Sequence, residues 1–234
     1  SAISAYGEPN FTTDIKYEKS SEKKIEINKK NYFLITDVKD IDDWIKQAEE
    51  NGEVAVDTET SSLDPHQADL VGVSLSHKIG KACYIPIGHN SKKCIDKDLV
   101  LKKLKPLLED PSIKKIGQNI KFDFIVFFNH GIKLNAMEDT MLMSYVLDAG
   151  KNRHNMDTLS EIHLNHKTIA FKDLVGTGKK EINFSQVDIE KAKDYAAEDA
   201  DVTYRLYKKF HKSLKEEKMI NIYEVFEKPM IKIL

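Results

Sequence analysis

Apolar and polar positions form a regular pattern only after residue 30. Residues 1–30 are polar and rich in Lys, Glu and Ser, without sustained apolar periodicity, so they predict a linker or loosely held extension. The apolar run at residues 31–36 predicts a short strand. Apolar residues then recur at helical spacing over 41–48, which predicts a helix that ends at Gly52.

Three mostly apolar segments follow this helix and are predicted to be strands. They cover residues 53–59, 69–77 and 81–88. Turn residues at 63–65 and 79–80 separate them, so we expect an antiparallel meander.

The rest of the chain is rich in helical patterns. The predicted elements are helices over residues 96–110, 119–131, 138–149 and 155–164 and a buried strand over 114–117. The longest helix is predicted from about residue 188 to 218, with Ser185 as its N-cap. This order predicts the α/β fold class, a mixed central β-sheet flanked by helices on both faces.

The composition is that of an ordinary globular protein, with 234 residues and a net charge of −2. This charge argues against a general nucleic-acid coat protein, but it permits an enzyme that holds a short strand in a cleft. No apolar stretch approaches the roughly 18 residues of a membrane span. Cys83 and Cys94 fit neither a disulfide framework nor a zinc site. We therefore expect a cytoplasmic protein without a membrane partner.

Two carboxylates stand at the end of the first meander strand. Asp57 and Glu59 are two residues apart, so their side chains share one face of a strand. Ligands of open α/β sheets bind at such strand ends, which makes a shared metal ion plausible. The alternative is a pair of solvated acids in a turn.

A third carboxylate, Asp123, falls early in the helix predicted after the buried strand. It could complement the helix dipole there, or it could serve a functional site. Gln118 and Asn119 precede it and are side chains of the kind that bind phosphate and sugar oxygens.

Tyr195 and Asp199 are four residues apart on the longest predicted helix and therefore lie on one face. Alanines around them would let this face pack close to the sheet, where an unpaired carboxylate is costly and a metal ion removes the cost. The alternative is a surface acidic helix, in which at least one of the neighbouring acids Glu198 and Asp201 is solvated.

Gathered by the fold, the four acids would make a hard-oxygen site suited to Mg²⁺ or Mn²⁺. Two such ions side by side can hydrolyse a phosphodiester, so the acids predict a nuclease. His163 and His166 lack further zinc ligands, and a structural role is predicted for them. The segment GTGKK at 176–180 lacks the spacing of a phosphate-binding loop, although it could be a mobile basic loop near DNA.

Several short segments occur in a specific order: DTETSSLD, YIPIGH, IGQNIKFD, RHNMDTL, HKTI followed by Phe, GKK and YAAEDADVT. Together they resemble the 3′–5′ proofreading exonuclease domain of bacterial DNA polymerase I, the family A repair polymerase. The resemblance runs from about Asn31 to Leu234. It implies a ribonuclease-H-like fold and a site with three Asp, one Glu and one Tyr.

The resemblance also implies roles for the site residues. Asp57 would bridge two divalent ions, Mg²⁺ or Mn²⁺, with Glu59 and Asp199 completing one ion's site and Asp123 supporting the other. Tyr195 would orient the attacking water. All the family's metal-ligand positions carry acids in this chain.

Further matches concern contacts with DNA. Leu63 matches the residue that wedges against the terminal bases, and Phe171 matches the aromatic residue that packs there. The remaining matched DNA-contacting positions are Gln118, Asn119 and Arg153. Phe122 stands where some relatives carry Tyr, which removes one hydroxyl contact.

The resemblance divides the chain into an extension (1–30), an exonuclease domain (31–220) and the start of a connection to a polymerase domain (221–234). The expected partners are a single-stranded or frayed DNA 3′ end and a covalently linked polymerase domain, in a monomeric protein associated with the bacterial nucleoid. Two alternatives stay open: an RNA-trimming 3′–5′ exonuclease of the same group, and a catalytically silent domain that binds single-stranded DNA.

Overall fold

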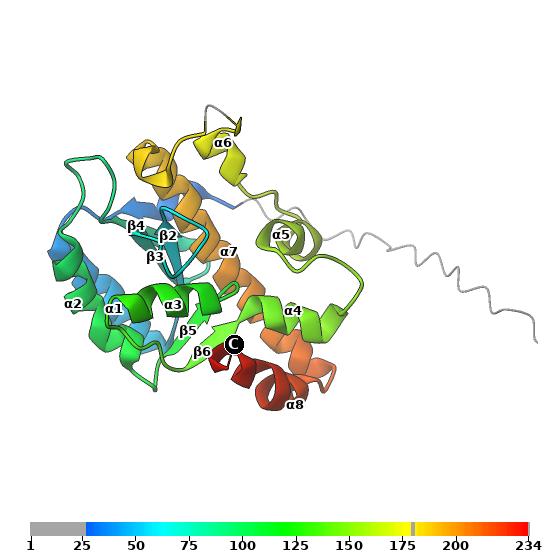
Figure 1. The fold of residues 1–234 in the computed structure, drawn as a ribbon. Coiled ribbons are helices and arrows are strands. Elements are labelled where there is room, and N and C mark those ends of the chain that lie inside the picture. Colours follow the sequence, from blue (N-terminus) through cyan, green and yellow to red (C-terminus); the bar gives the residue numbers. More distant parts are fainter. Residues whose placement is uncertain (1–26, 179–180, 234) are drawn as a thin grey trace, which may run out of the picture.

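The computed structural model describes residues 27–178 and 181–233, in which a six-stranded sheet is covered by helices on both faces (Figure 1). Most of the predicted N-terminal extension, and Lys179 and Lys180 of the predicted basic loop, lie outside the described residues. In the described part of the chain, no helix is both long and apolar enough to cross a membrane.

The sheet has the strand order β1-β4-β3-β2-β5-β6. The strands are β1 (Tyr32–Leu34), β2 (Glu53–Thr60), β3 (Leu70–Lys78), β4 (Lys81–Pro86), β5 (Lys114–Gly117) and β6 (Met137–Asp139). The predicted meander is confirmed, because β2, β3 and β4 pair antiparallel. The other pairs, β1 with β4, β2 with β5 and β5 with β6, are parallel, which confirms a mixed sheet.

Helices and helical turns lie between the strands and after β6. The helices are α1 (Ile41–Asn51), α2 (Lys97–Glu109), α3 (Lys121–Asn129), α4 (Thr140–Asp148), α5 (Met156–Leu164), α6 (Phe171–Val175), α7 (Ile189–Glu216) and α8 (Ile220–Ile222). The shorter turns are η1 (Lys29–Asn31), η2 (Val38–Asp40), η4 (Phe184–Gln186), η5 (Tyr223–Glu227) and η6 (Lys228–Lys232).

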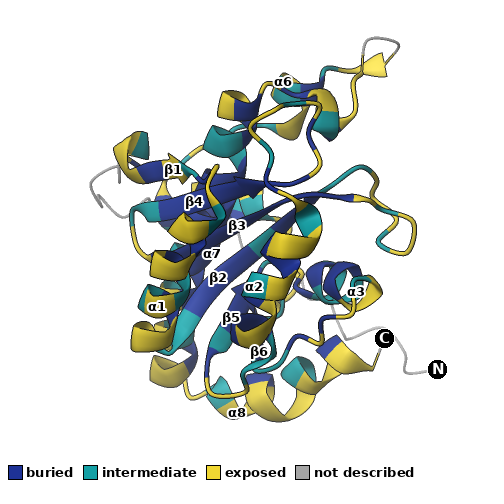
Figure 2. Ribbon diagram, turned by 90° about the vertical axis from the view of Figure 1, so that its left-hand side faces the viewer, coloured by how far each residue is buried: buried dark blue, intermediate teal, exposed yellow. Residues whose placement is uncertain are grey.

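The two faces of the sheet bury different side chains. Val54 and Val56 of β2 belong to a core that contains residues of α1, α2 and α3. Ala55 between them belongs to a second core with residues of α4, α5 and α7. This alternation is the period of a strand that is covered on both sides. Figure 2 shows the buried sheet between helices whose outer sides are exposed.

Two predicted boundaries were wrong. The helix predicted over 138–149 begins only at Thr140, because Met137–Asp139 pair with β5 as strand β6. The Asp139 side chain then caps α4 by accepting the N–H of Met141. The N-cap of α7 is Asp188, whose side chain accepts two backbone N–H groups, whereas the predicted cap Ser185 lies in η4.

Candidate active site

Strand β2 carries Asp57 and Glu59 to the edge of a cleft. Both residues pair with β3, Asp57 opposite Ser74 and Glu59 opposite Gly72, and the register shifts directly after Glu59. Side chains two residues apart on a strand point to one face, so both carboxylates face the cleft. Glu59 is almost fully buried and Asp57 is half-buried.

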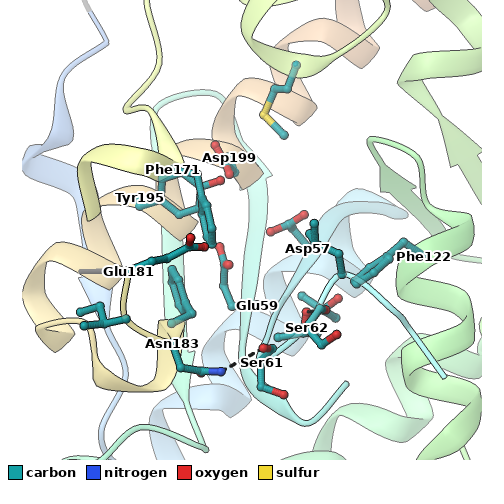
Figure 3. Close-up of a pocket in the computed structure, with 16 residues that line it drawn as sticks. Asp57, Glu59, Ser61, Ser62, Phe122, Phe171, Glu181, Asn183, Tyr195 and Asp199 are labelled. Carbon is teal, nitrogen blue, oxygen red and sulfur yellow. Dashed lines mark hydrogen bonds between the residues drawn. The ribbon is translucent and has the colours of Figure 1, made fainter. Parts of the chain in front are cut away.

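Helix α7 carries Tyr195 and Asp199 to the same cleft. The helix packs against β2, β3 and β4, and the alanines on its inner face have no exposed surface: Ala192, Ala196, Ala197 and Ala200. Small side chains at these positions let the helix backbone approach the sheet closely. The approach brings Asp199 to the level of the β2 acids, as Figure 3 shows.

The side chains of Asp57, Glu59 and Asp199 each offer an oxygen, and these oxygens lie within 4.8 Å of one another. Burial raises the pKa of all three carboxyl groups well above the ordinary value, and repulsion from nearby acids adds to the effect. Oxygen Oε1 of Glu59 is buried without a hydrogen-bond partner among the described residues. An oxygen-only donor set with an unpartnered buried oxygen fits a divalent cation such as Mg²⁺ or Mn²⁺.

Asp123 lies beside this trio. It occupies the first turn of α3, as predicted, and is almost fully buried. Its Oδ1 accepts hydrogen bonds from the backbone N–H (2.9 Å) and the hydroxyl (2.6 Å) of Thr58. Thr58 stands between the two β2 acids, so this contact fixes α3 directly to the strand that carries them.

Tyr195 is half-buried and lies against the acids and against two aromatic rings. Burial raises the pKa of its hydroxyl above the ordinary value, and the negative charge of Asp199 raises the pKa further. The phenol is therefore neutral and can donate a hydrogen bond. The rings of Phe171 and Phe184 lie 6.0 and 6.1 Å from the Tyr195 ring and hold it in place.

The cleft in front of these groups has a volume of about 870 Å³. One wall is the loop after β2, and the other is formed by Phe171 of α6 and by residues 181–184. The lining residues are Asp57, Thr58, Glu59, Thr60, Ser61, Ser62, Leu63, Phe122, Met156, Phe171, Glu181, Ile182, Asn183, Phe184, Tyr195 and Asp199. A hydrogen bond of 2.9 Å from Asn183 Nδ2 to the Ser61 carbonyl joins the two walls (Figure 3).

The structure brings only some of the predicted DNA-contacting residues to the cleft. Leu63 lines it with 90% of the residue's surface exposed, and Phe171 lines it from the opposite wall. Gln118, Asn119 and Arg153 are not among the lining residues. The Gln118 amide instead bonds the His154 carbonyl at 2.7 Å, so this side chain joins β5 to the segment beside Arg153.

The predicted alternative of a surface acidic helix, with Glu198 or Asp201 in solvent, was wrong. Both side chains are buried. Glu198 accepts hydrogen bonds from His166 and from the backbone N–H of Ile169. Asp201 forms an ion pair with Arg205 at 3.0 Å. Buried acids are tolerated here because each has close polar partners.

The contact with Glu198 also gives His166 the structural role predicted for it. His163 packs edge-on against Phe210, with ring centroids 4.8 Å apart.

Sequence reasoning missed Asn183 and Phe184, which complete the second wall of the cleft. Asn183 joins the walls, and Phe184 stacks on Phe171 with the ring planes 6° apart. A local signal existed, because Asn183 caps η4 and Gln186 completes a capping box. Their position opposite β2 depends on tertiary contacts that no local pattern reveals.

The raised pKa values predict that the metal-free protein loses stability as pH rises. The folded state binds protons more tightly than the unfolded chain, whose Asp and Glu keep pKa values of 3.8 and 4.5. The stabilisation is complete below these values and is lost as pH rises through the raised values. In EDTA, the midpoint temperature of thermal unfolding should fall as the pH is raised toward 8. Addition of Mn²⁺ at pH 8 should raise this temperature again. An Asp57→Asn variant should show a flatter pH profile; an unchanged profile would contradict the electrostatic account.

Comparisons with known proteins identify the family. A family described as 3′–5′ exonuclease matches residues 32–215. The chain is 42% identical to DNA polymerase I of Pseudomonas aeruginosa over 211 residues, which cover 87% of this chain and 23% of that protein. It is also 42% identical to DNA polymerase I of Rhizobium leguminosarum, covering 87% of this chain and 22% of that protein. The chain thus spans less than a quarter of these relatives.

Solved structures share the fold at lower identity. Escherichia coli RNase D, an exoribonuclease involved in structured RNA processing, superposes with a TM-score of 0.66 at 17% identity, over 87% of this chain and 50% of that one. Brucella melitensis NrnC with bound Mg²⁺ superposes with a TM-score of 0.55 at 25% identity, over 82% and 79%. The predicted α/β, ribonuclease-H-like fold is therefore confirmed. The chain belongs to the 3′–5′ exonuclease family and is an exonuclease domain of the DNA polymerase I type.

Proposed function

We propose that this chain removes nucleotides from the 3′ end of single-stranded or frayed DNA by metal-dependent hydrolysis of the terminal phosphodiester. The observation that carries the proposal is the trio of Asp57, Glu59 and Asp199. Two distant segments bring carboxylate oxygens of these residues within 4.8 Å of one another, and Glu59 also carries a buried oxygen, Oε1, without a hydrogen-bond partner among the described residues. A neutral tyrosine stands beside the trio at the cleft.

Two divalent ions, Mg²⁺ or Mn²⁺, are proposed as cofactors. Asp57, Glu59 and Asp199 would hold one ion, and Asp57 with Asp123 would hold the second. Bound there, the ions would supply hydroxide at neutral pH and stabilise charge on the phosphate and the leaving oxygen. The Mg²⁺ bound by the NrnC structure supports this choice of ion.

The protein's own groups would position the reactants. The neutral Tyr195 hydroxyl can donate a hydrogen bond to the attacking water, and the Glu59 carboxylate can accept one from it. Thr58 keeps Asp123 against β2 through two hydrogen bonds, so the acids are fixed before substrate arrives. Fixed geometry of this kind raises the rate, because the entropy of bringing the reacting groups together is lost before the chemical step and not during it.

End specificity would follow from the shape of the cleft. Leu63 and Phe171 face the cleft from opposite walls, where they can pack on a terminal base of any sequence. Asn183 joins the two walls through its hydrogen bond to the Ser61 carbonyl. A frayed end would be preferred, because a mismatched base costs less free energy to unpair.

Three residues outside the cleft are proposed to contact the DNA backbone. Asn119 and Arg153 are exposed, and their amide and guanidinium groups can bind phosphate oxygens. Gln118 is half-buried and its amide is already bonded to the His154 carbonyl, so we expect its main contribution to be the placement of the Arg153 segment.

The domain would act as the proofreading module of a DNA polymerase I in replication and repair. Relatives named DNA polymerase I are more than four times as long as their match to this chain. We propose that residues 31–220 form the exonuclease domain and that 221–234 begin the connection to a covalently linked polymerase domain. The domain itself would work as a monomer.

Replacing Tyr195 with phenylalanine should lower turnover without abolishing it. The variant keeps the ring that packs against Phe171 and Phe184 but loses the hydroxyl beside Asp199. We expect a decrease in turnover of about 10- to 100-fold, the scale of one lost positioning group. Single-turnover assays on a labelled DNA strand would measure it. An unchanged rate would remove Tyr195 from the mechanism.

RNA trimming is the second candidate, because RNase D shares the fold. The test uses DNA and RNA strands of identical sequence, labelled at the 5′ end, with Mg²⁺ and with Mn²⁺. Faster shortening of DNA from its 3′ end would support the proposal, and faster shortening of RNA would replace it. A third candidate, silent binding of single-stranded DNA, requires that neither strand is shortened.

A further inference from the structure

Tyr223 lies beyond residues 32–215, where the family match ends, yet it is completely buried. It begins η5 in the C-terminal segment that packs beside α4 and β6 (Figure 1). Its hydroxyl donates to Glu138 Oε2 at 2.9 Å and accepts the backbone N–H of Asp139 at 2.9 Å. Lys228 completes the contact by donating to Glu138 Oε1 at 2.6 Å. The C-terminal segment is therefore bonded to the end of β6.

Asp139 also bonds the turn between β5 and α3. Its carboxylate accepts the backbone N–H groups of Asn119 at 3.0 Å and Ile120 at 3.1 Å. Asn119 has a φ of 59°, a left-handed conformation that costs free energy for a residue other than glycine. The turn is also tight, because a Cβ on Gly117 would lie 2.7 Å from the Ile120 side chain. The two hydrogen bonds that the Asp139 carboxylate accepts stabilise this otherwise unfavourable turn.

The β5–α3 turn also determines where helix α3 begins. Helix α3 begins at Lys121, directly after the turn, and Asp123 lies in its first turn. Asp123 bonds both the backbone and the hydroxyl of Thr58 between the β2 acids. A continuous series of hydrogen bonds and one helical turn thus links Tyr223 to the proposed site.

We propose that Tyr223 is a positioning residue of the nuclease site, because it fixes the β5–α3 turn through Asp139. The fixed turn holds Asp123 beside Asp57 and presents Asn119 to the DNA strand. The inference rests on the proposed function for its effect on catalysis. It also extends the functional unit past the family's matched range. A displacement of the C-terminal segment would therefore move the β5–α3 turn and Asp123 through the same hydrogen bonds.

The chain offers a closely matched control for a Tyr223→Phe variant. Tyr204 is buried, and its hydroxyl donates to Glu53 at 2.8 Å. Glu53 also accepts from Lys208 at 2.6 Å, as Glu138 does from Lys228. Tyr204→Phe therefore also removes a tyrosine hydroxyl from a Glu–Lys pair, one that is more exposed than the pair of Glu138 and Lys228. It touches neither Asp139 nor the β5–α3 turn.

The test combines amide hydrogen exchange with steady-state hydrolysis of a single-stranded oligodeoxynucleotide in Mg²⁺, at a temperature where circular dichroism shows every variant folded. In Tyr223→Phe we expect faster exchange at Asn119 and Ile120 and a kcat lower by about tenfold. In Tyr204→Phe both quantities should match the wild type. Asp139→Asn, which removes one of the two carboxylate oxygens that accept the N–H groups of Asn119 and Ile120, should reproduce the Tyr223→Phe result, and the double variant should add little.

Two outcomes would overturn the proposal: protection of the turn that survives in Tyr223→Phe, whatever the kcat, or a kcat equal to that of Tyr204→Phe. If Tyr223→Phe does not fold, the Asp139→Asn result decides in the same way. An inactive wild type would contradict the proposed function instead. The exchange rates at Asn119 and Ile120 would then still decide whether Tyr223 holds the turn.

Discussion

An Asp199→Asn variant is expected to lose exonuclease turnover by about 10³-fold or more. The substitution removes a negatively charged ligand of the proposed metal site, and a divalent ion bound there would stabilise the transition state by several kcal/mol. Asparagine keeps the shape of the side chain, and it removes a charge that is buried beside two other acids. The fold should therefore persist, and the metal-free variant should be at least as stable as the wild type. Binding of a single-stranded oligonucleotide should change little.

Asp194→Asn is the matched control for this substitution. Asp194 lies on the same helix, five residues before Asp199, and its side chain is 43% exposed beside Lys193. Turnover of the control should equal that of the wild type. Single-turnover rates in Mg²⁺ and Mn²⁺, with a thermal unfolding curve for each protein, make the comparison. Near-wild-type cleavage by Asp199→Asn would exclude this residue as a metal ligand.

The largest loss of stability is expected for Asp201→Ala. Asp201 has no exposed surface and bonds three groups: the Tyr32 hydroxyl at 2.8 Å, the Gly80 N–H at 2.7 Å and the Arg205 guanidinium at 3.0 Å. These partners join α7 to β1 and to the β3–β4 turn. Alanine would leave a largely buried guanidinium without its partner, which costs about 3 to 5 kcal/mol of unfolding free energy.

Urea denaturation at pH 7 would measure the loss as a lower midpoint with an unchanged slope. Asp194→Ala on the same helix should change the unfolding free energy by less than about 1 kcal/mol, because the Asp194 side chain is exposed to solvent. Equal midpoints for the two variants would show that the buried network around Asp201 contributes little.

Local periodicity was enough to predict the principal elements and the faces that carry the site. Asp57 and Glu59 are two apart on a strand, and Tyr195 and Asp199 are four apart on a helix; these spacings place each pair on one face whatever the rest of the fold does. The first turn of α3 was also predicted correctly for Asp123. The convergence of β2 and α7 on one cleft came from the family resemblance.

What the sequence could not predict depends on contacts between distant segments. Asp201 looks like a surface acid locally, but Tyr32 and Gly80 cover it from 169 and 121 residues away. Strand β6 has only three residues inside a helical pattern and exists because it pairs with β5. Gln118 has the chemistry of a phosphate ligand, yet its amide bonds a carbonyl 36 residues away.

Product analysis tests the central claim most directly. The chain is incubated with a 5′-labelled single-stranded DNA that has a 3′ extension, in Mg²⁺, Mn²⁺ or EDTA, beside an Asp57→Ala variant. The account predicts a ladder that shortens from the 3′ end and releases nucleoside 5′-monophosphates only with a divalent metal, and no ladder with the variant. Shortening in EDTA, or an equal ladder from Asp57→Ala, would contradict a metal-dependent exonuclease site at Asp57, Glu59 and Asp199.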